Sequence, residues 1–355
     1  MDNGEGAAHI VTMTTPLSGL PTVLDAGWLA HRYDPTGDAV HFLPVPRETH
    51  RQATFLTDEY LPAGLAPLVL RRGDAIASAI APAPLHFIFH SAFCCSTLLA
   101  RAFDVPGAAM GLKEPVIFND LIGWRRRGDQ GPDMASVLDD MLRLVARPFA
   151  PGEAVVVKPS TIANALAPAI LTLRPSSNAL LLHAPLRTFL TSVAKKEIEG
   201  RLWVRTLLTG ILDDGMARFG FSTRELLGFT DLQVAAVGWL GQHALFGDLV
   251  ARFGPQRVRT FDSATLMEQP RAAIAAIAAL FGVTLDDAAL DAIVAGPAFT
   301  RHSKFGNRFD AGSRASEHRT AADHHAREID IVMTWAERTA QALGLSMTPP
   351  APLLP

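Results

Sequence analysis

The stretch from His86 to Asp104, HFIFHSAFCCSTLLARAFD, constrains the fold of this chain more than any other. Its first five residues form a short run of apolar, aromatic and β-branched side chains, which predicts a buried strand. Small residues around Phe93 follow as a tight turn, and apolar residues recur at helical spacing after Ser96 and Thr97. The stretch therefore predicts a strand, a turn and a helix in immediate succession.

Such a turn is able to bind an anion. A helix that begins at Ser96 directs unpaired backbone N–H groups and the positive end of its dipole toward the turn. The hydroxyls of Ser96 and Thr97 can donate to the same oxygen atoms. An ordinary strand-to-helix turn with Ser96 as N-cap accounts for the same residues. The turn is not a Walker A loop, because Cys95 stands where that motif has Lys and the chain holds no Gly-Lys pair.

Length and composition set the class of protein. A chain of 355 residues that is 48% hydrophobic can form one large domain or two smaller ones. The net charge of −3 gives no bulk attraction to nucleic acid or to an anionic membrane. The two cysteines are adjacent, which excludes a disulfide framework and a CxxC zinc site and fits a reducing compartment. Since neither a signal peptide nor a long uncharged apolar run is evident, we expect a cytoplasmic protein with no nucleic-acid or membrane partner.

Further apolar runs at 154–157, 178–182 and 258–261 alternate with helical patterns. Strands that alternate with helices are typical of an α/β fold with a central parallel sheet flanked by helices. We expect residues 81–347 to form this domain. Residues 1–80 are expected to be an N-terminal extension packed on it, and residues 348–355 a flexible tail.

Polar residues follow several of the predicted strands. The turn at 90–97, Lys158 and His183 each come directly after an apolar run, and Glu114 precedes Pro115, which biases it toward extended geometry. Ligands of such sheets bind beyond the carboxyl ends of the strands. The sequence therefore predicts that these groups meet in one site.

The turn resembles the 5′-phosphosulfate-binding loop of the sulfotransferase family, which uses the nucleotide donor PAPS. The hydroxyl pair Ser96–Thr97 and the helix after it match the family's loop, whereas Phe93 stands at the position of its cationic residue and Cys94–Cys95 at that of its Ser-Gly. The stretch 257–283 is similar to the family's strand, loop and helix segment. The resemblance implies a P-loop-type three-layer sandwich, with PAPS as sulfuryl donor and PAP as product.

The resemblance also assigns residues to the nucleotide. His183 and Pro185 fall on the strand end that holds the 3′-phosphate, with His183 in place of an Arg, and the basic loop around Lys304 resembles the segment that closes over the nucleotide. Arg187 can supply the charge that His183 lacks, since His183 is a cation only if its pKa stays near neutral. The nucleotide-binding residues that we expect are His90, Ser91, Phe93, Cys94, Cys95, Ser96, Thr97, His183, Arg187, Thr191, Ser192 and Lys304.

Two residues are expected to carry the chemistry. Sulfuryl transfer needs stabilisation of the leaving phosphate, for which Lys158 is the candidate, and a base for the acceptor. Glu114 is the expected base, because it is placed like the Glu base of the tyrosylprotein sulfotransferase branch. No metal is expected, since the spacing of His318, Asp323, His324 and His325 matches no standard site.

Other functions stay open at this stage. A non-catalytic or regulatory nucleotide-binding protein would keep the same fold, and a phosphotransferase is opposed by the missing Gly-Lys pair. A thiol at a helix N-terminus has a lowered pKa, so Cys94 or Cys95 could act as a nucleophile with His90 or His183 as base. The main expectation is an enzyme that sulfurylates a hydroxyl or amine of a small-molecule acceptor. The sequence identifies neither the acceptor nor the oligomeric state.

Overall fold

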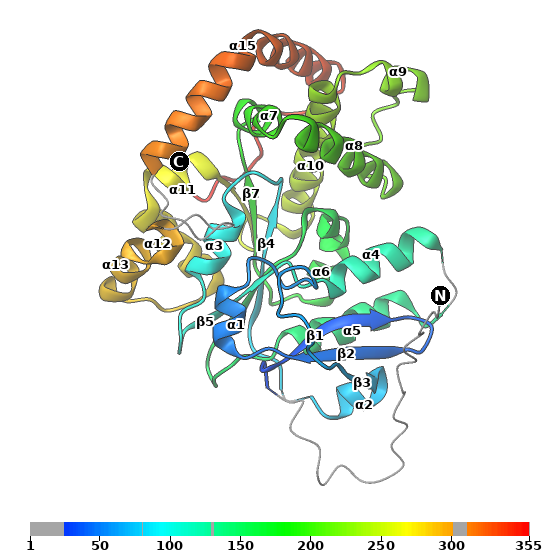
Figure 1. Cartoon of the computed structure of the whole chain (residues 1–355), viewed down its shortest axis with the longest axis vertical. Helices are drawn as coiled ribbons and strands as arrows, with labels where there is room; N and C mark the ends of the chain where they lie inside the picture. Colours follow the sequence, from blue (N-terminus) through cyan, green and yellow to red (C-terminus); the bar gives the residue numbers. More distant parts are fainter. Residues whose placement is uncertain (1–24, 80, 129–130, 301–310, 355) are drawn as a thin grey trace, which may run out of the picture.

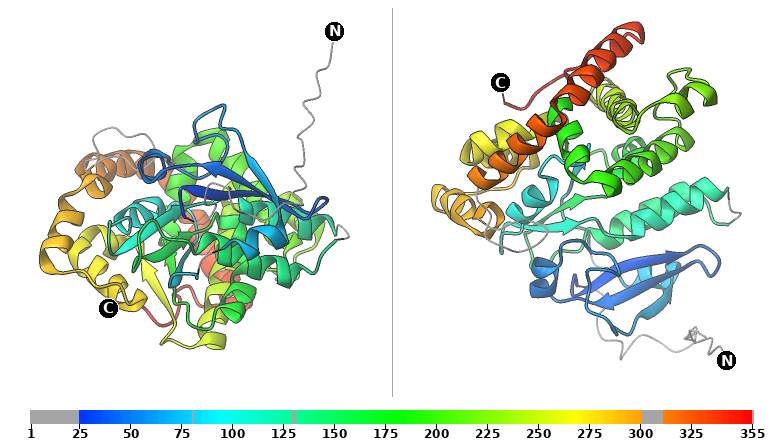
Figure 2. Two further views of the ribbon diagram at one scale, coloured as in Figure 1. Left: turned by 90° about the horizontal axis from the view of Figure 1, so that it is seen from below. Right: turned by 45° about the horizontal axis from the view of Figure 1, so that its top comes forward.

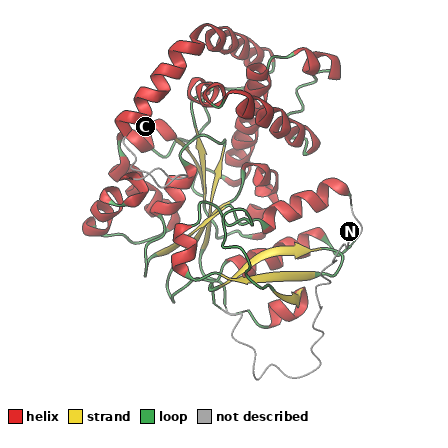
Figure 3. Cartoon of the chain, viewed as in Figure 1, coloured by secondary structure: helices red, strands yellow, loops and turns green. Residues whose placement is uncertain are grey.

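The computed structural model describes residues 25–79, 81–128, 131–300 and 311–354. Within these ranges the chain forms two sheets, a small N-terminal one and a larger central one (Figure 1). Helices surround the central sheet, as the colouring by secondary structure shows (Figure 3).

The central sheet is fully parallel and has the strand order β5-β6-β4-β7-β8. The apolar runs of the sequence form four of its strands, because strands buried on both faces need apolar side chains on both. The fifth strand, β5, contains a glycine and a lysine and is not predicted from the sequence. The strands are β4 (Leu85–His90), β5 (Ala109–Lys113), β6 (Ala154–Lys158), β7 (Ala179–His183) and β8 (Val258–Asp262).

Helices cover both faces of this sheet, which makes three layers. Val156 and Leu182 pack with one set of helices, whereas Val155 and Val157 pack with the other, as expected from the alternation of side chains along a strand. The first set contains α3 (Ser96–Ala102), α7 (Leu186–Lys195), α8 (Glu197–Asp213), α12 (Pro270–Phe281) and α15 (Ala311–Ala342). The second contains α4 (Ile117–Arg127), α5 (Met134–Val145), η1 (Thr161–Leu166) and α6 (Ala167–Leu173). The predicted α/β three-layer architecture is confirmed.

Helix α10 (Asp231–Phe253) contributes to both hydrophobic clusters. It is long and apolar enough to cross a membrane, but 72% of its most apolar window is buried inside the protein. It therefore acts as a core helix of this fold. The other helices described in the main domain are α9 (Thr223–Gly228), α11 (Ser263–Glu268), α13 (Asp287–Ala295) and α14 (Pro297–Thr300).

The N-terminal region forms an antiparallel sheet that packs beside α4 and α5 (Figure 2). Its buried side chains belong to the same hydrophobic cluster as those of α4 and α5, so the two regions share one core. Its elements are β1 (Trp28–Asp34), β2 (Ala39–Pro44), α1 (Arg47–Gln52), β3 (Leu68–Arg71) and α2 (Arg72–Ala77).

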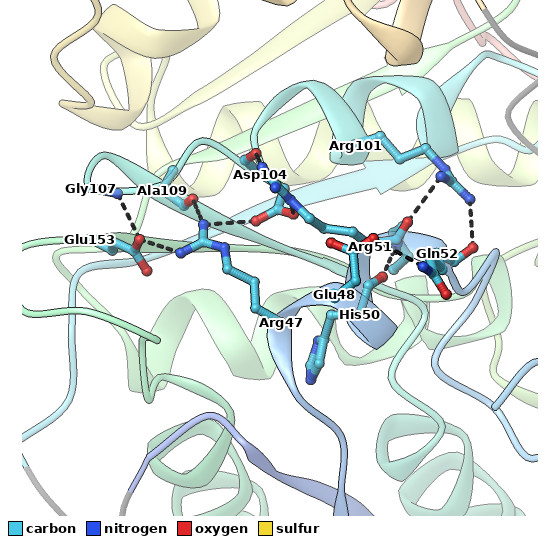
Figure 4. A network of polar contacts seen from close by, with 11 residues as sticks. Arg47, Glu48, His50, Arg51, Gln52, Arg101, Asp104, Gly107, Ala109 and Glu153 are labelled. Carbon is cyan, nitrogen blue, oxygen red and sulfur yellow. Dashed lines mark hydrogen bonds and ion pairs between the residues drawn. The ribbon is translucent and has the colours of Figure 1, made fainter. Parts of the chain in front are cut away.

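A network of charged groups joins α1 to the main domain (Figure 4). Arg47 donates to Glu153 at 2.5 Å and to Asp104 at 2.8 Å, and Arg51 donates to Asp104 at 2.8 Å. Cations also bind the carbonyls at the C-terminal end of α1, where the helix dipole is negative. Arg101 donates to the Arg51 and Ala53 carbonyls, and Lys113 to those of His50 and Arg51. We call Arg47, Arg51, Arg101, Asp104, Lys113 and Glu153 the charged network.

The C-terminal segment lies along the edge strand β8. The sequence predicts a flexible tail here, whereas the structure places the segment beside the sheet. The Thr260 N–H donates to the Ala351 carbonyl at 3.1 Å, and the Leu353 N–H donates to the Thr260 carbonyl at 2.9 Å. The tail thereby covers the exposed edge of β8 and satisfies its backbone groups.

Candidate anion-binding and catalytic site

The loop after β4 has an unusual backbone. Ala92, Phe93 and Cys95 all have positive φ angles, of 68°, 52° and 60°. Residues with a Cβ avoid this left-handed region, and each such residue costs about 1–3 kcal/mol. Successive N–H groups of a turn that contains left-handed residues can form a concave nest that suits an anion. The predicted strand, turn and helix are confirmed, and the turn takes a form that a plain N-cap does not need.

Several N–H groups of this loop are unpaired. Within the described part of the chain, the backbone N–H groups of Phe93, Cys94, Ser96 and Thr97 have no protein acceptor. All but Phe93 are buried residues. Because buried N–H groups nearly always find a partner, a cluster of them without one is suited to an external anion.

His90 and Ser91 hold the start of the loop. The buried His90 ring accepts from the Ala92 N–H through Nδ1 at 3.2 Å and lies 3.1 Å from the Pro159 carbonyl through Nε2. These partners suit a neutral ring with its proton on Nε2. The Ser91 hydroxyl accepts from the Ala184 N–H at 3.3 Å. Both side chains therefore shape the loop, and a direct contact of either with a ligand stays a prediction.

Lys158 and Glu114 lie beside each other at the carboxyl edge of the sheet. The Lys158 ammonium donates to the Glu114 carboxylate, and the Glu114 N–H donates to the Lys158 carbonyl at 2.7 Å. The Lys158 side chain is 1% exposed, whereas that of Glu114 is 19% exposed and so is accessible to a ligand. Pro115 favours extended geometry for Glu114, but the structure gives it a φ of 52°. The backbone bond to Lys158 holds this conformation and joins the two predicted catalytic residues.

The N-terminal region adds aromatic side chains to this site. The Leu56 N–H donates to the Lys113 carbonyl at 2.7 Å, and the Val116 N–H donates to the Leu56 carbonyl, so this segment runs beside Glu114. Phe55 thereby covers Lys158, whose Nζ lies 5.1 Å from the ring centroid, and Tyr60 packs edge-on against Phe55. Their only signal in the sequence is aromatic character within a region rich in loops.

The thiols and Phe93 complete the loop. The Phe93 ring contacts Phe189 of α7 and Trp203 of α8, with centroids 5.6 and 5.2 Å apart. Cys94 is fully buried, and burial raises the pKa of its thiol to about 12. A lowered pKa is what a thiolate nucleophile at this helix end requires, so the structure speaks against Cys94 in that role. Neither Cys94 nor Cys95 forms a disulfide within the described residues.

The end of β7 offers hydrogen-bonding groups. His183 is 8% exposed, and burial lowers the pKa of its ring, although Asp262 acts in the opposite direction. Its ring packs edge-on against His243 at 5.2 Å, and its Nδ1 has no partner among the described residues. Burial therefore opposes the cationic form of this ring, which a charged phosphate ligand requires.

The other residues assigned to the nucleotide lie on α7. The Thr191 hydroxyl donates to the Arg187 carbonyl at 2.9 Å, and the Ser192 hydroxyl donates to the Thr188 carbonyl at 2.8 Å. Arg187 is half exposed and forms an ion pair with Asp330 of α15 at 2.6 Å. The assignments to Arg187, Thr191 and Ser192 stay predictions, and Lys304 lies outside the described residues.

Solved structures of sulfotransferases are similar to this chain. A sulfotransferase domain from the curacin biosynthetic pathway is 14% identical over 75% of this chain and 99% of its own, with a TM-score of 0.41. A sulfotransferase from Mycobacterium avium is 12% identical over 71% of this chain and 79% of its own, with a TM-score of 0.42. No protein-family model and no curated protein matches the chain. The family that the sequence motifs resemble is also the family of these solved structures.

Proposed function

We propose that this protein transfers a sulfuryl group from PAPS to a hydroxyl or amine of a small-molecule acceptor. The observation that carries the proposal is the position of the Lys158–Glu114 pair at the carboxyl edge of the central sheet. The loop with four unpaired N–H groups follows β4 at the same edge of this sheet. A cation, a carboxylate and an anion-binding nest are the groups that this transfer needs. We assign the protein to the cytoplasm, with no nucleic acid or membrane as partner.

Each group has one task in the transfer. Glu114 takes the proton from the acceptor while the acceptor oxygen or nitrogen attacks sulfur. The bond between sulfur and the 5′-phosphate oxygen breaks, and PAP leaves with the electron pair of that bond. Lys158 and the loop N–H groups stabilise the charge that develops on the leaving phosphate. Lys158 therefore supplies the cation that Phe93 does not.

The loop fits the 5′-phosphosulfate end of the donor. Its unpaired N–H groups are donors, and phosphate and sulfate oxygens are acceptors. At the 3′ end, His183 would offer a hydrogen bond although burial opposes its charged form, and Arg187 would have to leave Asp330 to contribute charge.

A non-catalytic nucleotide-binding protein is the second candidate. The observation in its favour is Phe93, which packs on Phe189 and Trp203 where the resembled family places a cation. In that case the Lys158–Glu114 ion pair would serve the fold alone, and its removal would affect stability without affecting any turnover.

Calorimetric titration with PAP, in the presence of chelator, tests the donor site. We expect micromolar binding, and no binding to the folded protein would contradict the proposal. An acceptor screen with PAPS follows, with Glu114→Gln as the decisive variant. It keeps the shape of the side chain but removes the base, so turnover should fall by about 10²–10⁴-fold while PAP still binds.

Glu337→Gln is the matched control, because Glu337 is an exposed carboxylate on α15. It should retain wild-type turnover. Equal turnover of Glu114→Gln and Glu337→Gln would show that Glu114 is not the base of the reaction. PAP binding by the wild type without turnover of any acceptor would favour the non-catalytic protein.

A further inference from the structure

A neutral polar cluster lies beneath the loop. Asn164 of η1 and Gln242 of α10 are both fully buried. The Asn164 amide donates to the His90 carbonyl at 2.9 Å and to the Gln242 amide oxygen at 3.1 Å. Gln242 in turn donates to the Ser91 carbonyl at 3.5 Å. The carbonyls of His90 and Ser91 are thus held by side chains from two other elements. We call His90, Asn164 and Gln242 the neutral cluster.

The side chain of His90 acts on the same backbone. Its Nδ1 accepts from the Ala92 N–H, the first N–H of the left-handed stretch. Its Nε2 is fixed by the Pro159 carbonyl, which follows β6. The ring therefore cannot rotate without the loss of two buried hydrogen bonds, and the orientation of the Ala92 peptide depends on it.

The loop needs this external support. No glycine stands between His90 and Ser96, although three of the residues there have positive φ. Local preference disfavours that conformation, so it persists only where surrounding structure determines it. Within the described residues, Asn164 Oδ1 has no partner, whereas Asn164 Nδ2 donates both of the bonds named above. The two donated bonds are therefore the polar contacts of this side chain there.

We propose that Asn164 and Gln242, acting with His90, are positioning residues for anion binding. They hold the first carbonyls of the loop in the core, which keeps the N–H groups of Phe93 and Cys94 preorganised for the anion. The identity of that anion, the phosphosulfate of the donor, rests on the proposed function. The positioning itself rests only on the hydrogen bonds and on the backbone angles.

Asn164→Leu tests the proposal, since leucine has a similar size and donates no hydrogen bond. Two measurements are made where the variant is fully folded: amide hydrogen exchange of the peptide covering residues 91–97, and the dissociation constant for PAP. We expect exchange to become about tenfold faster and the dissociation constant to rise about tenfold or more, which corresponds to about 1.4 kcal/mol.

Asn178→Leu is the matched control. Asn178 also donates to a backbone carbonyl, that of Leu280, but it lies at the opposite end of β7. It should lower the melting temperature without changing loop exchange or PAP affinity. His90→Asn should retain much of the affinity that His90→Leu loses, because the Asn oxygen can replace Nδ1 as acceptor.

The outcomes separate the two proposals. Unchanged loop exchange in Asn164→Leu would overturn the positioning role, and so would unchanged PAP affinity. If the wild-type protein binds no PAP, the proposed function fails, while the exchange measurement still decides the positioning role. If Asn164→Leu does not fold, Gln242→Met removes the contact to the Ser91 carbonyl and serves in its place.

Discussion

The two ends of α3 lie against buried polar regions of opposite kinds. At its C-terminal end, the charged network pairs Arg47 and Arg51 with Asp104, and Arg47 also with Glu153. At its N-terminal end, the neutral cluster binds the loop through a histidine and two amides. Ion pairs hold α1 of the N-terminal region against the main domain. Neutral groups support the loop for which we propose anion binding, so the side chains of the neutral cluster neither neutralise nor repel an anion there.

The largest loss of stability is expected for a variant that removes one charge from the charged network. Arg47→Met removes the cation that pairs with the fully buried Glu153, whereas Asp104 keeps its ion pair with Arg51. Breaking a buried pair by removing one partner costs about 3–5 kcal/mol, so the free energy of unfolding should fall by that amount in denaturant titration. PAP affinity should be unchanged at temperatures where the variant is folded.

Arg51→Met is the control within the same network. Arg51 binds the same Asp104, but its side chain is 42% exposed, and exposed pairs contribute about 0–1 kcal/mol. A similar loss in both variants would show that burial of Glu153 does not determine the cost. A loss of PAP affinity in Arg47→Met would show that the two ends of α3 are coupled.

The charged network should also give the protein a pH-dependent stability. Burial, together with the nearby Arg101, lowers the pKa of Lys113 to about 7. Between pH 7 and 9 the unfolded chain then holds a proton that the folded chain has released, so stability rises with pH. One proton over two pH units corresponds to at most about 2–3 kcal/mol.

Lys113→Met should remove this rise. The free energy of unfolding, measured by denaturant titration at pH 7 and at pH 9, should increase more in the wild type than in the variant. Lys196→Met serves as control because Lys196 is exposed, and its pH profile should run parallel to that of the wild type. If the profiles of wild type and Lys113→Met are parallel, the lowered pKa of Lys113 is wrong.

Sequence patterns predicted the parts of this fold that depend on local periodicity. The buried strands at 154–157 and 178–182 and the turn before Ser96 follow from apolar runs and small residues. The sequence also predicted that Glu114 and Lys158 meet, and the pairing of β5 with β6 in the structure brings them together. The strand β5 was missed because Gly111 and Lys113 interrupt its apolar character. Gly111 is needed there, since a Cβ would lie 2.1 Å from the Ala100 carbonyl oxygen.

The support of the loop could not be predicted from the sequence. Asn164 and Gln242 lie far from His90 along the chain, and only the packing of η1 and α10 beneath the loop brings them together. The left-handed conformation of the loop could not be predicted either. Local preference for Ala92, Phe93 and Cys95 opposes positive φ, so no local pattern could indicate it.

Conversion of the neutral cluster into a charged one is the sharpest test of the comparison. Gln242→Glu keeps the size of the side chain but replaces a donor to the Ser91 carbonyl by a carboxylate beneath the loop. Burial raises the pKa of a carboxyl group, and ionisation as the pH rises places negative charge near the incoming anion. PAP affinity should therefore be nearer to wild type at pH 5 and fall by about tenfold or more at pH 8.

Gln242→Met separates the effect of the charge from that of the lost hydrogen bond, because its loss of affinity relative to wild type should not depend on pH. If Gln242→Glu and Gln242→Met show the same pH profile, the absence of charge beneath the loop has no part in anion binding, and the difference between the two ends of α3 reflects packing alone.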